Sequence, residues 1–158
     1  MPFRSPLRAI LLGGLTVGAL DGLDAIIFFG LRGVGPTRIF QAIAAGLLGR
    51  DAFQGGFPTA ALGVVLHYTI ATTIVAVAFL IAQRVPALTT RPIVVGACYG
   101  IGVWLVMNLV VVPLSAANPA ARSAPVLING ILIHILGVGI PAWLFAAKVP
   151  RAAPQAAL

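Results

Sequence analysis

Four long apolar stretches constrain the fold of this chain more than any other feature of its sequence. They cover approximately residues 9–30, 59–82, 93–114 and 125–147. Each reaches the length of about 20 residues that an α-helix needs to cross a hydrocarbon core about 30 Å thick. Because lipid offers the backbone no hydrogen-bonding partners, a crossing segment satisfies its own peptide groups as a helix. The sequence therefore predicts an all-α membrane protein with four transmembrane helices in a single domain of residues 1–148.

The composition favours lipid as the solvent for much of the chain. Its 158 residues are 60% hydrophobic and 8% charged, whereas about a quarter of the residues in a soluble domain are charged. The net charge of +7 comes from basic residues that stand singly at the ends of the apolar stretches, where lipid headgroups would meet them. They form no basic patch of the kind that binds nucleic acid. We expect the lipid bilayer as the main partner and no nucleic acid, and the sequence leaves open other membrane subunits or a homodimer.

The basic residues also predict an orientation. With four crossings, one side of the membrane would hold Arg4, Arg8, Arg84, Arg91, Lys148 and Arg151, and the other side would hold Arg32, Arg38, Arg50 and Arg122. Basic residues in short loops favour the cytoplasmic side. Six against four therefore predicts that both termini are cytoplasmic.

A short amphipathic helix is predicted over residues 36–49, between the first two spans. Pro36 is suited to the start of a helix and Gly49 to its end. Apolar residues recur between them at helical spacing, and Arg38, Gln41 and Arg50 fall elsewhere. This pattern is typical of a helix that lies in the outer membrane interface, and a helix packed over the mouth of the bundle would show it equally. Residues 149–158 are rich in Ala and Pro and are predicted to be a disordered tail.

Spans two and four share a spacing that suggests an internal repeat. Pro58, Gly63 and His67 recur in register as Pro125, Gly130 and His134, and spans one and three share Gly18-Ala19 with Gly22 and Gly96-Ala97 with Gly100. A duplicated two-helix hairpin would produce this order, with a symmetry axis along the membrane normal. The glycines themselves are predicted to allow close helix packing within the bundle rather than a homodimer contact.

Six Asp, His and Asn residues interrupt the apolar stretches. They are Asp21, Asp24, His67, Asn108, Asn129 and His134. A charged side chain at this depth costs about 2.5–3.5 kcal/mol on insertion scales, so such residues usually face the protein interior. Counting inward at about 1.5 Å per residue puts all six near one depth in the outer half of the membrane. The sequence thus predicts a buried polar layer to which every span contributes.

Three functions are compatible with this layer. Asp–His and Asn–backbone hydrogen bonds could fix helix packing, which is our leading interpretation and makes the chain a structural or accessory subunit of a membrane complex. The layer could instead pass protons or ions, as in a small proton- or ion-coupled permease. In a third interpretation His67 and His134 are axial ligands of a haem or another tetrapyrrole, or join Asp21 and Asp24 in a metal site. The P-loop and G-x-S-x-G motifs are absent, so no enzyme activity is predicted.

Four segments resemble a group of uncharacterised bacterial four-helix membrane proteins. They are GLLGRDAFQGG (46–56), ALGVVLH (61–67), VMNLVVVPLSA (106–116) and IHILGVGIP (133–141). The resemblance implies a bacterial inner (plasma) membrane location and four spans. It implies no activity.

Overall fold

The computed structural model describes residues 5–117 and 123–149, and within these residues the chain is helical with no β-strand. Four helices are long and apolar enough to cross a membrane. They are α1 (Pro6–Gly30), α3 (Gly56–Arg84), the third span Pro92–Leu114 and the fourth span Ala124–Ala147. The predicted all-α fold with four such helices is confirmed, and their bounds agree with the predicted ranges to within about one helical turn.

The third and fourth spans are each interrupted by a π-helical segment. The third consists of α4 (Pro92–Val106), the π-helix η3 (Met107–Val111) and α5 (Val112–Leu114). The fourth consists of α6 (Ala124–Ile133), the π-helix η4 (His134–Gly139) and α7 (Ile140–Ala147). Single π-helical turns inside α-helices are uncommon and often occur at functional sites.

Proline and glycine residues set the helix boundaries. A proline occupies the first turn of α1, α4 and α6, where its missing N–H would have had no helical partner. Gly49 follows α2 (Pro36–Leu48) and is the first residue of the 3₁₀-helix η1 (Gly49–Phe53). Its φ of 62° is a backbone conformation that glycine adopts without steric cost. The short 3₁₀-helix η2 (Pro86–Thr89) connects α3 to α4.

The outer surface of the four spans is apolar. Large exposed side chains include Leu23 on α1, Val65 on α3, Leu109 in η3 and Leu136 in η4. In the most apolar stretch of the third span, only 11% is buried inside the protein. Water would strongly disfavour so much exposed apolar surface, whereas lipid would not. The fold is therefore consistent with a multi-pass helical membrane protein.

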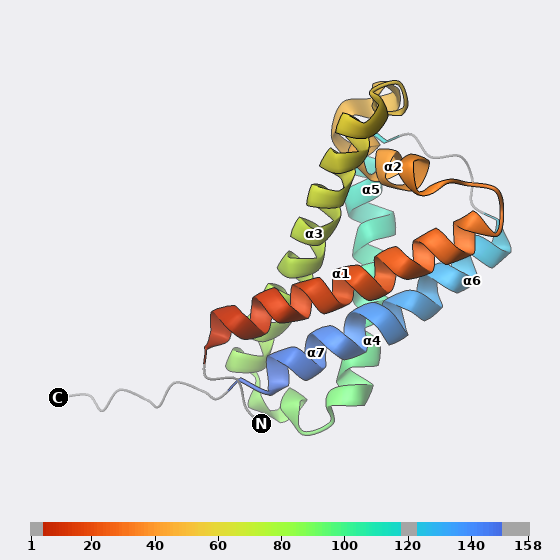
Figure 1. Cartoon of the computed structure of the whole chain (residues 1–158). Helices are drawn as coiled ribbons and strands as arrows, with labels where there is room; N and C mark the ends of the chain where they lie inside the picture. Colours follow the sequence, from red (N-terminus) through yellow and green to blue (C-terminus); the bar gives the residue numbers. More distant parts are fainter. Residues whose placement is uncertain (1–4, 118–122, 150–158) are drawn as a thin grey trace.

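Small residues bring the helices into close contact. A Cβ on Gly18 of α1 would lie 2.6 Å from the Tyr68 ring of α3, and one on Gly96 of α4 would lie 2.8 Å from the Ile140 backbone. The glycines of both predicted motifs therefore serve contacts within the chain. Figure 1 shows α1 beside the fourth span, with α3 crossing them. In each half the first span packs on the second, α1 on α3 and α4 on η4 and α7, but the duplication itself stays a prediction.

The helix α2 occupies the range predicted for an amphipathic helix and packs against α3. Its buried residues include Ile39, Ala44 and Gln41. Gln41 is thus not on the polar face to which the sequence assigned it. Its side-chain amide donates to the Gly56 carbonyl at 3.0 Å and to Thr59 Oγ1 at 3.3 Å, and these bonds compensate for its burial. The location of α2 at a membrane interface stays a prediction.

Only the first residue of the predicted tail can be compared with the structure. Val149 is buried, with 6% of its surface exposed. Residues 150–158 lie outside the described residues, as do Arg4, Arg122 and Arg151.

Candidate functional site

The six polar residues predicted to form a layer all line one cavity of about 360 Å³. Asp21 and Asp24 come from α1, His67 from α3, Asn108 from η3, Asn129 from α6 and His134 from η4. All four spans therefore contribute a polar side chain to the same space. Most of the remaining lining is apolar, and no Lys or Arg belongs to it among the described residues. The depth of the cavity in a membrane stays a prediction.

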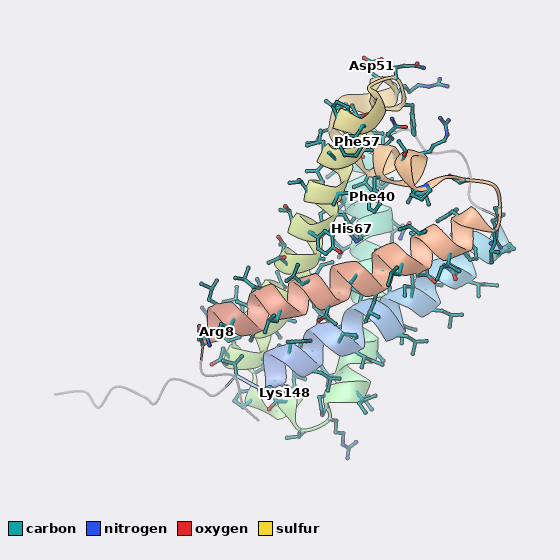
Figure 2. All side chains as sticks on the ribbon, viewed as in Figure 1. Arg8, Phe40, Asp51, Phe57, His67 and Lys148 are labelled. Carbon is teal, nitrogen blue, oxygen red and sulfur yellow. The ribbon has the colours of Figure 1, made fainter. Side chains whose placement is uncertain are left out.

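His67 connects α3 to α1. Its Nε2 atom lies 2.8 Å from the Gly18 carbonyl oxygen. Because a carbonyl oxygen only accepts hydrogen bonds, Nε2 carries a proton and is the donor in this hydrogen bond. Gly22 leaves room for the ring, since a Cβ there would lie 3.2 Å from Nε2. Figure 2 shows His67 between α3 and α1, close to Phe40 of α2.

The other ring nitrogen of His67 faces Asp21. Nδ1 lies 3.9 Å from Asp21 Oδ2, which is within ion-pair range and beyond a direct hydrogen bond. In the neutral ring Nδ1 has no proton, because the hydrogen bond to Gly18 fixes the proton on Nε2. The pair is therefore electrostatically favourable when one proton is bound at Nδ1 or on the Asp21 carboxyl group.

Asp24 has a different partner, although it shares a face of α1 with Asp21. The Asn129 side-chain amide of α6 donates to Asp24 Oδ2 at 2.7 Å. This bond joins the first span to the fourth across 105 residues of sequence. A short hydrogen bond to a carboxylate is among the stronger hydrogen bonds in proteins. The two aspartates of α1 thus have distinct environments: one is bonded to an amide, and the other faces an imidazole.

Asn108 and His134 form their hydrogen bonds within their own spans. Asn108 Nδ2 donates to the Trp104 carbonyl at 2.7 Å, and His134 Nδ1 donates to the Gly130 carbonyl at 2.8 Å. Asn108 lies in the π-helix η3, and His134 is the first residue of η4. His134 Nε2 has no hydrogen-bonding partner within residues 5–117 and 123–149. It is the one nitrogen of the two rings that is neither bonded to a carbonyl nor paired with a carboxylate.

The haem hypothesis fits only one of the two histidines. A metal-binding imidazole typically donates from one nitrogen to a carbonyl or carboxylate and binds the metal with the other. His134 meets this requirement, with Nδ1 donating to Gly130 and Nε2 left over. His67 donates from Nε2 to Gly18, and Asp21 stands on its Nδ1 side at 3.9 Å, where the tetrapyrrole would have to lie. The geometry therefore does not fit axial ligation by both rings.

The alternative mixed metal site also lacks support. Within the described part of the chain, no group of three or more His, Cys, Asp or Glu side chains is arranged to hold a metal ion.

Two aromatic residues of the cavity were not selected from the sequence. Phe29 of α1 and Trp104 of α4 contribute to the lining. A Cβ on Gly130 would lie 3.0 Å from the Trp104 indole nitrogen, so this glycine makes room for the indole. The position of Trp104 one helical turn before Asn108 was the available signal, but an aromatic residue in a span is more often a packing residue.

Comparisons with known proteins do not add a function to this geometry. No family model, no curated protein and no solved structure matches the chain.

Proposed function

We propose that this chain is a small bacterial inner-membrane permease that carries a cation in a process coupled to protons or ions. The observation that carries the proposal is the cavity among the four spans, which is lined by Asp21 and Asp24 and by no Lys or Arg among the described residues. The location in the bacterial inner membrane, with both termini in the cytoplasm, belongs to the same proposal and is supported by the four apolar helices and the resemblance described above.

The charge of the cavity favours a cation. An ionised carboxylate in a low-dielectric environment is strongly disfavoured unless a positive charge or hydrogen-bond donors accompany it. Asp24 has one donor in Asn129. Asp21 has none among the described residues, and it forms an ion-pair contact with a histidine that is charged only when protonated. A proton or a bound cation supplies the missing positive charge, whereas an anion would add to the repulsion.

The test is flux through purified protein in proteoliposomes of phosphatidylethanolamine and phosphatidylglycerol. A pH gradient should drive uptake of a small cation, and Asp21→Asn should remove it. The chain has three acidic residues, and the third, Asp51, is exposed in η1 outside the cavity. Asp51→Asn is therefore a matched control that should transport like the unmodified protein. Absence of any cation flux in folded protein would contradict the proposal.

A second candidate is a structural or accessory subunit of a membrane complex, without transport. The observation in its favour is that the polar layer joins helices directly, through His67 to Gly18 and through Asn129 to Asp24. Hydrogen bonds between membrane helices contribute about 0.6 kcal/mol on average. If this candidate is correct, His67→Ala and Asp24→Asn should lower thermal stability while no variant changes a flux.

A further inference from the structure

The hydrogen bonds of the cavity specify its ligand more closely, and this inference depends on the proposed cation transport. We propose that the cavity binds a small cation with N–H donors, ammonium or a primary alkylammonium ion, in exchange for a proton held between Asp21 and His67. The direction of the hydrogen bonds, the difference between the two aspartates and the charge balance of the cavity support this assignment.

Most hydrogen-bond donors of the polar layer already have acceptors within the protein. His67 Nε2 donates to Gly18 and His134 Nδ1 donates to Gly130. The side-chain amides of Asn108 and Asn129 each donate one proton, to Trp104 and to Asp24.

The groups left over are mainly acceptors. Within the part of the chain that the structure describes, they are Asp21, the second carboxylate oxygen of Asp24, the Asn108 and Asn129 side-chain oxygens, and His134 Nε2. No fully buried side-chain N or O atom in that part lacks a partner, so these unpartnered acceptors are not fully buried, and the residues that carry them line the cavity. The donors that also remain are the second side-chain N–H of Asn108 and of Asn129 and the indole N–H of Trp104. An acceptor-rich cavity complements a ligand that brings its own donors.

Asp21 is the carboxylate at which a proton can be exchanged for a cation. Asp24 accepts a hydrogen bond from Asn129 at 2.7 Å, whereas Asp21 has no hydrogen-bond donor among the described residues and forms an ion-pair contact with the His67 ring at 3.9 Å. The titratable groups that interact electrostatically with Asp21 are His134 from η4, His67 from α3 and Asp24 from α1. The third span and α2 contribute only non-titratable residues to the lining. Asp21 therefore lies where a proton on either histidine or a bound cation would act on the same negative charge.

Exchange of one proton for one monovalent cation keeps the net charge of the cavity constant. With a proton on the Asp21–His67 pair, the negative charge of Asp21 is compensated and an additional cation gains little from it. When a monovalent ammonium ion binds beside Asp21, the proton leaves the pair for solvent, and the net charge of the cavity stays the same. One cation thus replaces one proton, without a change in any covalent bond other than the N–H or O–H that releases the proton.

The apolar part of the lining selects for a partly organic ion. The Trp104 and Phe29 rings belong to the lining, and aromatic faces attract cations that have been stripped of water. A cavity of about 360 Å³ is at the small end of ligand sites. Methylammonium combines a charge, three N–H donors and a methyl group, and it is the probe of choice.

The test is calorimetric titration of the purified full-length protein in detergent with methylammonium chloride, in two buffers of different ionisation enthalpy. The buffer dependence of the heat gives the number of protons released. We expect one proton per bound ion in the unmodified protein and in the Asp51→Asn control. Asp21→Asn should weaken binding by about tenfold or more, as for the loss of one charged hydrogen bond, and should abolish the proton release. Asp24→Asn should keep the release, because Asp21 is intact.

The outcomes separate this inference from the proposed function. Binding of Na⁺ or K⁺ in preference to methylammonium, or binding without proton release, overturns the inference and leaves cation transport in place. Loss of proton release in Asp24→Asn but not in Asp21→Asn also overturns it, by assigning the exchange to the other aspartate. No binding of any cation to monodisperse protein overturns both. Gel filtration of each variant shows whether it is folded. If Asp21→Asn fails to fold, Asp21→Glu is the second variant, and it should bind methylammonium because it keeps the carboxylate.

Discussion

The two aspartates of α1 are three residues apart, and the structure distinguishes them by their partners. Asp24 accepts a hydrogen bond from Asn129 of the fourth span, and Asp21 faces His67 of the second. Helical spacing predicts that both lie on one face, but it does not say which neighbouring helix each one meets. The sequence offered no reason to prefer Asp21 over Asp24 for proton exchange, and the hydrogen bonds supply that reason.

The bond between Asp24 and Asn129 should have a measurable free energy. Asn129→Leu removes the donor and leaves the Asp24 carboxylate without a hydrogen bond, so we expect a lower free energy of unfolding. In a double-mutant cycle with Asp24→Leu, which removes the acceptor, the coupling energy should be about 0.6 kcal/mol and at most about 1.7 kcal/mol, the range measured between membrane helices. Thermal or steric-trapping measurements in detergent micelles give the values. Asn108→Leu is the control, because Asn108 bonds within its own span, and its coupling with Asp24→Leu should be near zero.

The His67 ring should be held in one tautomer. Because Nε2 donates to Gly18, the neutral ring should carry its proton on Nε2, and His134 should carry its proton on Nδ1. Nitrogen NMR of protein labelled at histidine distinguishes the two tautomers, and His67→Gln and His134→Gln assign the signals. Two rings with the same tautomer would contradict the hydrogen-bond assignment on which the cavity argument depends.

The glycines of α4 bring its backbone into close contact with the backbone of the fourth span. A Cβ on Gly100 would lie 2.8 Å from the His134 carbonyl carbon and 3.0 Å from the Ile135 Cα atom. These are backbone atoms at the start of the π-helix η4, so they cannot move aside as a flexible side chain would. The contact also positions His134 in the cavity.

Gly100→Ala should therefore destabilise the protein, whereas Gly102→Ala should not. Overpacking a well-packed contact costs about 1–3 kcal/mol. A Cβ on Gly102, on the same helix, would meet no atom within 4 Å, and alanine favours helix over glycine by about 1 kcal/mol. The difference in midpoint temperature between the two variants in one detergent is the measurement. Equal stability of the two variants would show that α4 and η4 are not in backbone contact.

The elements also show where sequence reasoning stops. Apolar length located four spans, and counting along them gathered six residues that all line one cavity. Counting fixes the depth of a residue but not the helix that it faces, so the pairing of Asp24 with Asn129 could not be predicted. The apolar pattern does not distinguish a π-helical turn from an α-helical one, so the π-helices at Asn108 and His134 could not be predicted. The helical period shows which residues share a side of α2 and so places Gln41 among the polar ones. It does not show that Thr59 and the Gly56 carbonyl lie opposite Gln41.

At the scale of the whole molecule, the charged ends of the spans agree with an even number of crossings. Figure 2 shows Arg8 and Lys148 at one end of the molecule and Asp51 at the other. The connection between α3 and α4 lies between Arg84 and Pro92, and it belongs to the end that holds Arg8. Arg32 lies just after α1, with its guanidinium 3.6 Å from the centre of the Phe28 ring, an arrangement that suits a membrane interface because the stem is apolar and the charge can reach headgroups.

This arrangement predicts which loops a reagent can reach from outside the cell. In a Cys98→Ala background, which removes the chain's single cysteine, Asp51→Cys should react with a membrane-impermeant maleimide in intact spheroplasts. Ser5→Cys and Thr90→Cys should react only after the membrane is permeabilised, because the positive-inside rule assigns the end with Arg8, Arg84 and Arg91 to the cytoplasm. Labelling of all three sites in permeabilised cells shows that each cysteine can react in the folded protein.

If Ser5→Cys and Thr90→Cys react from outside while Asp51→Cys does not, the orientation is inverted. Any proton-coupled flux would then run with the opposite polarity to the one expected from cytoplasmic termini. If Ser5→Cys and Thr90→Cys react on opposite sides, the hairpin of α1 and α3 does not cross the membrane twice, and the cavity is not enclosed by four spanning helices.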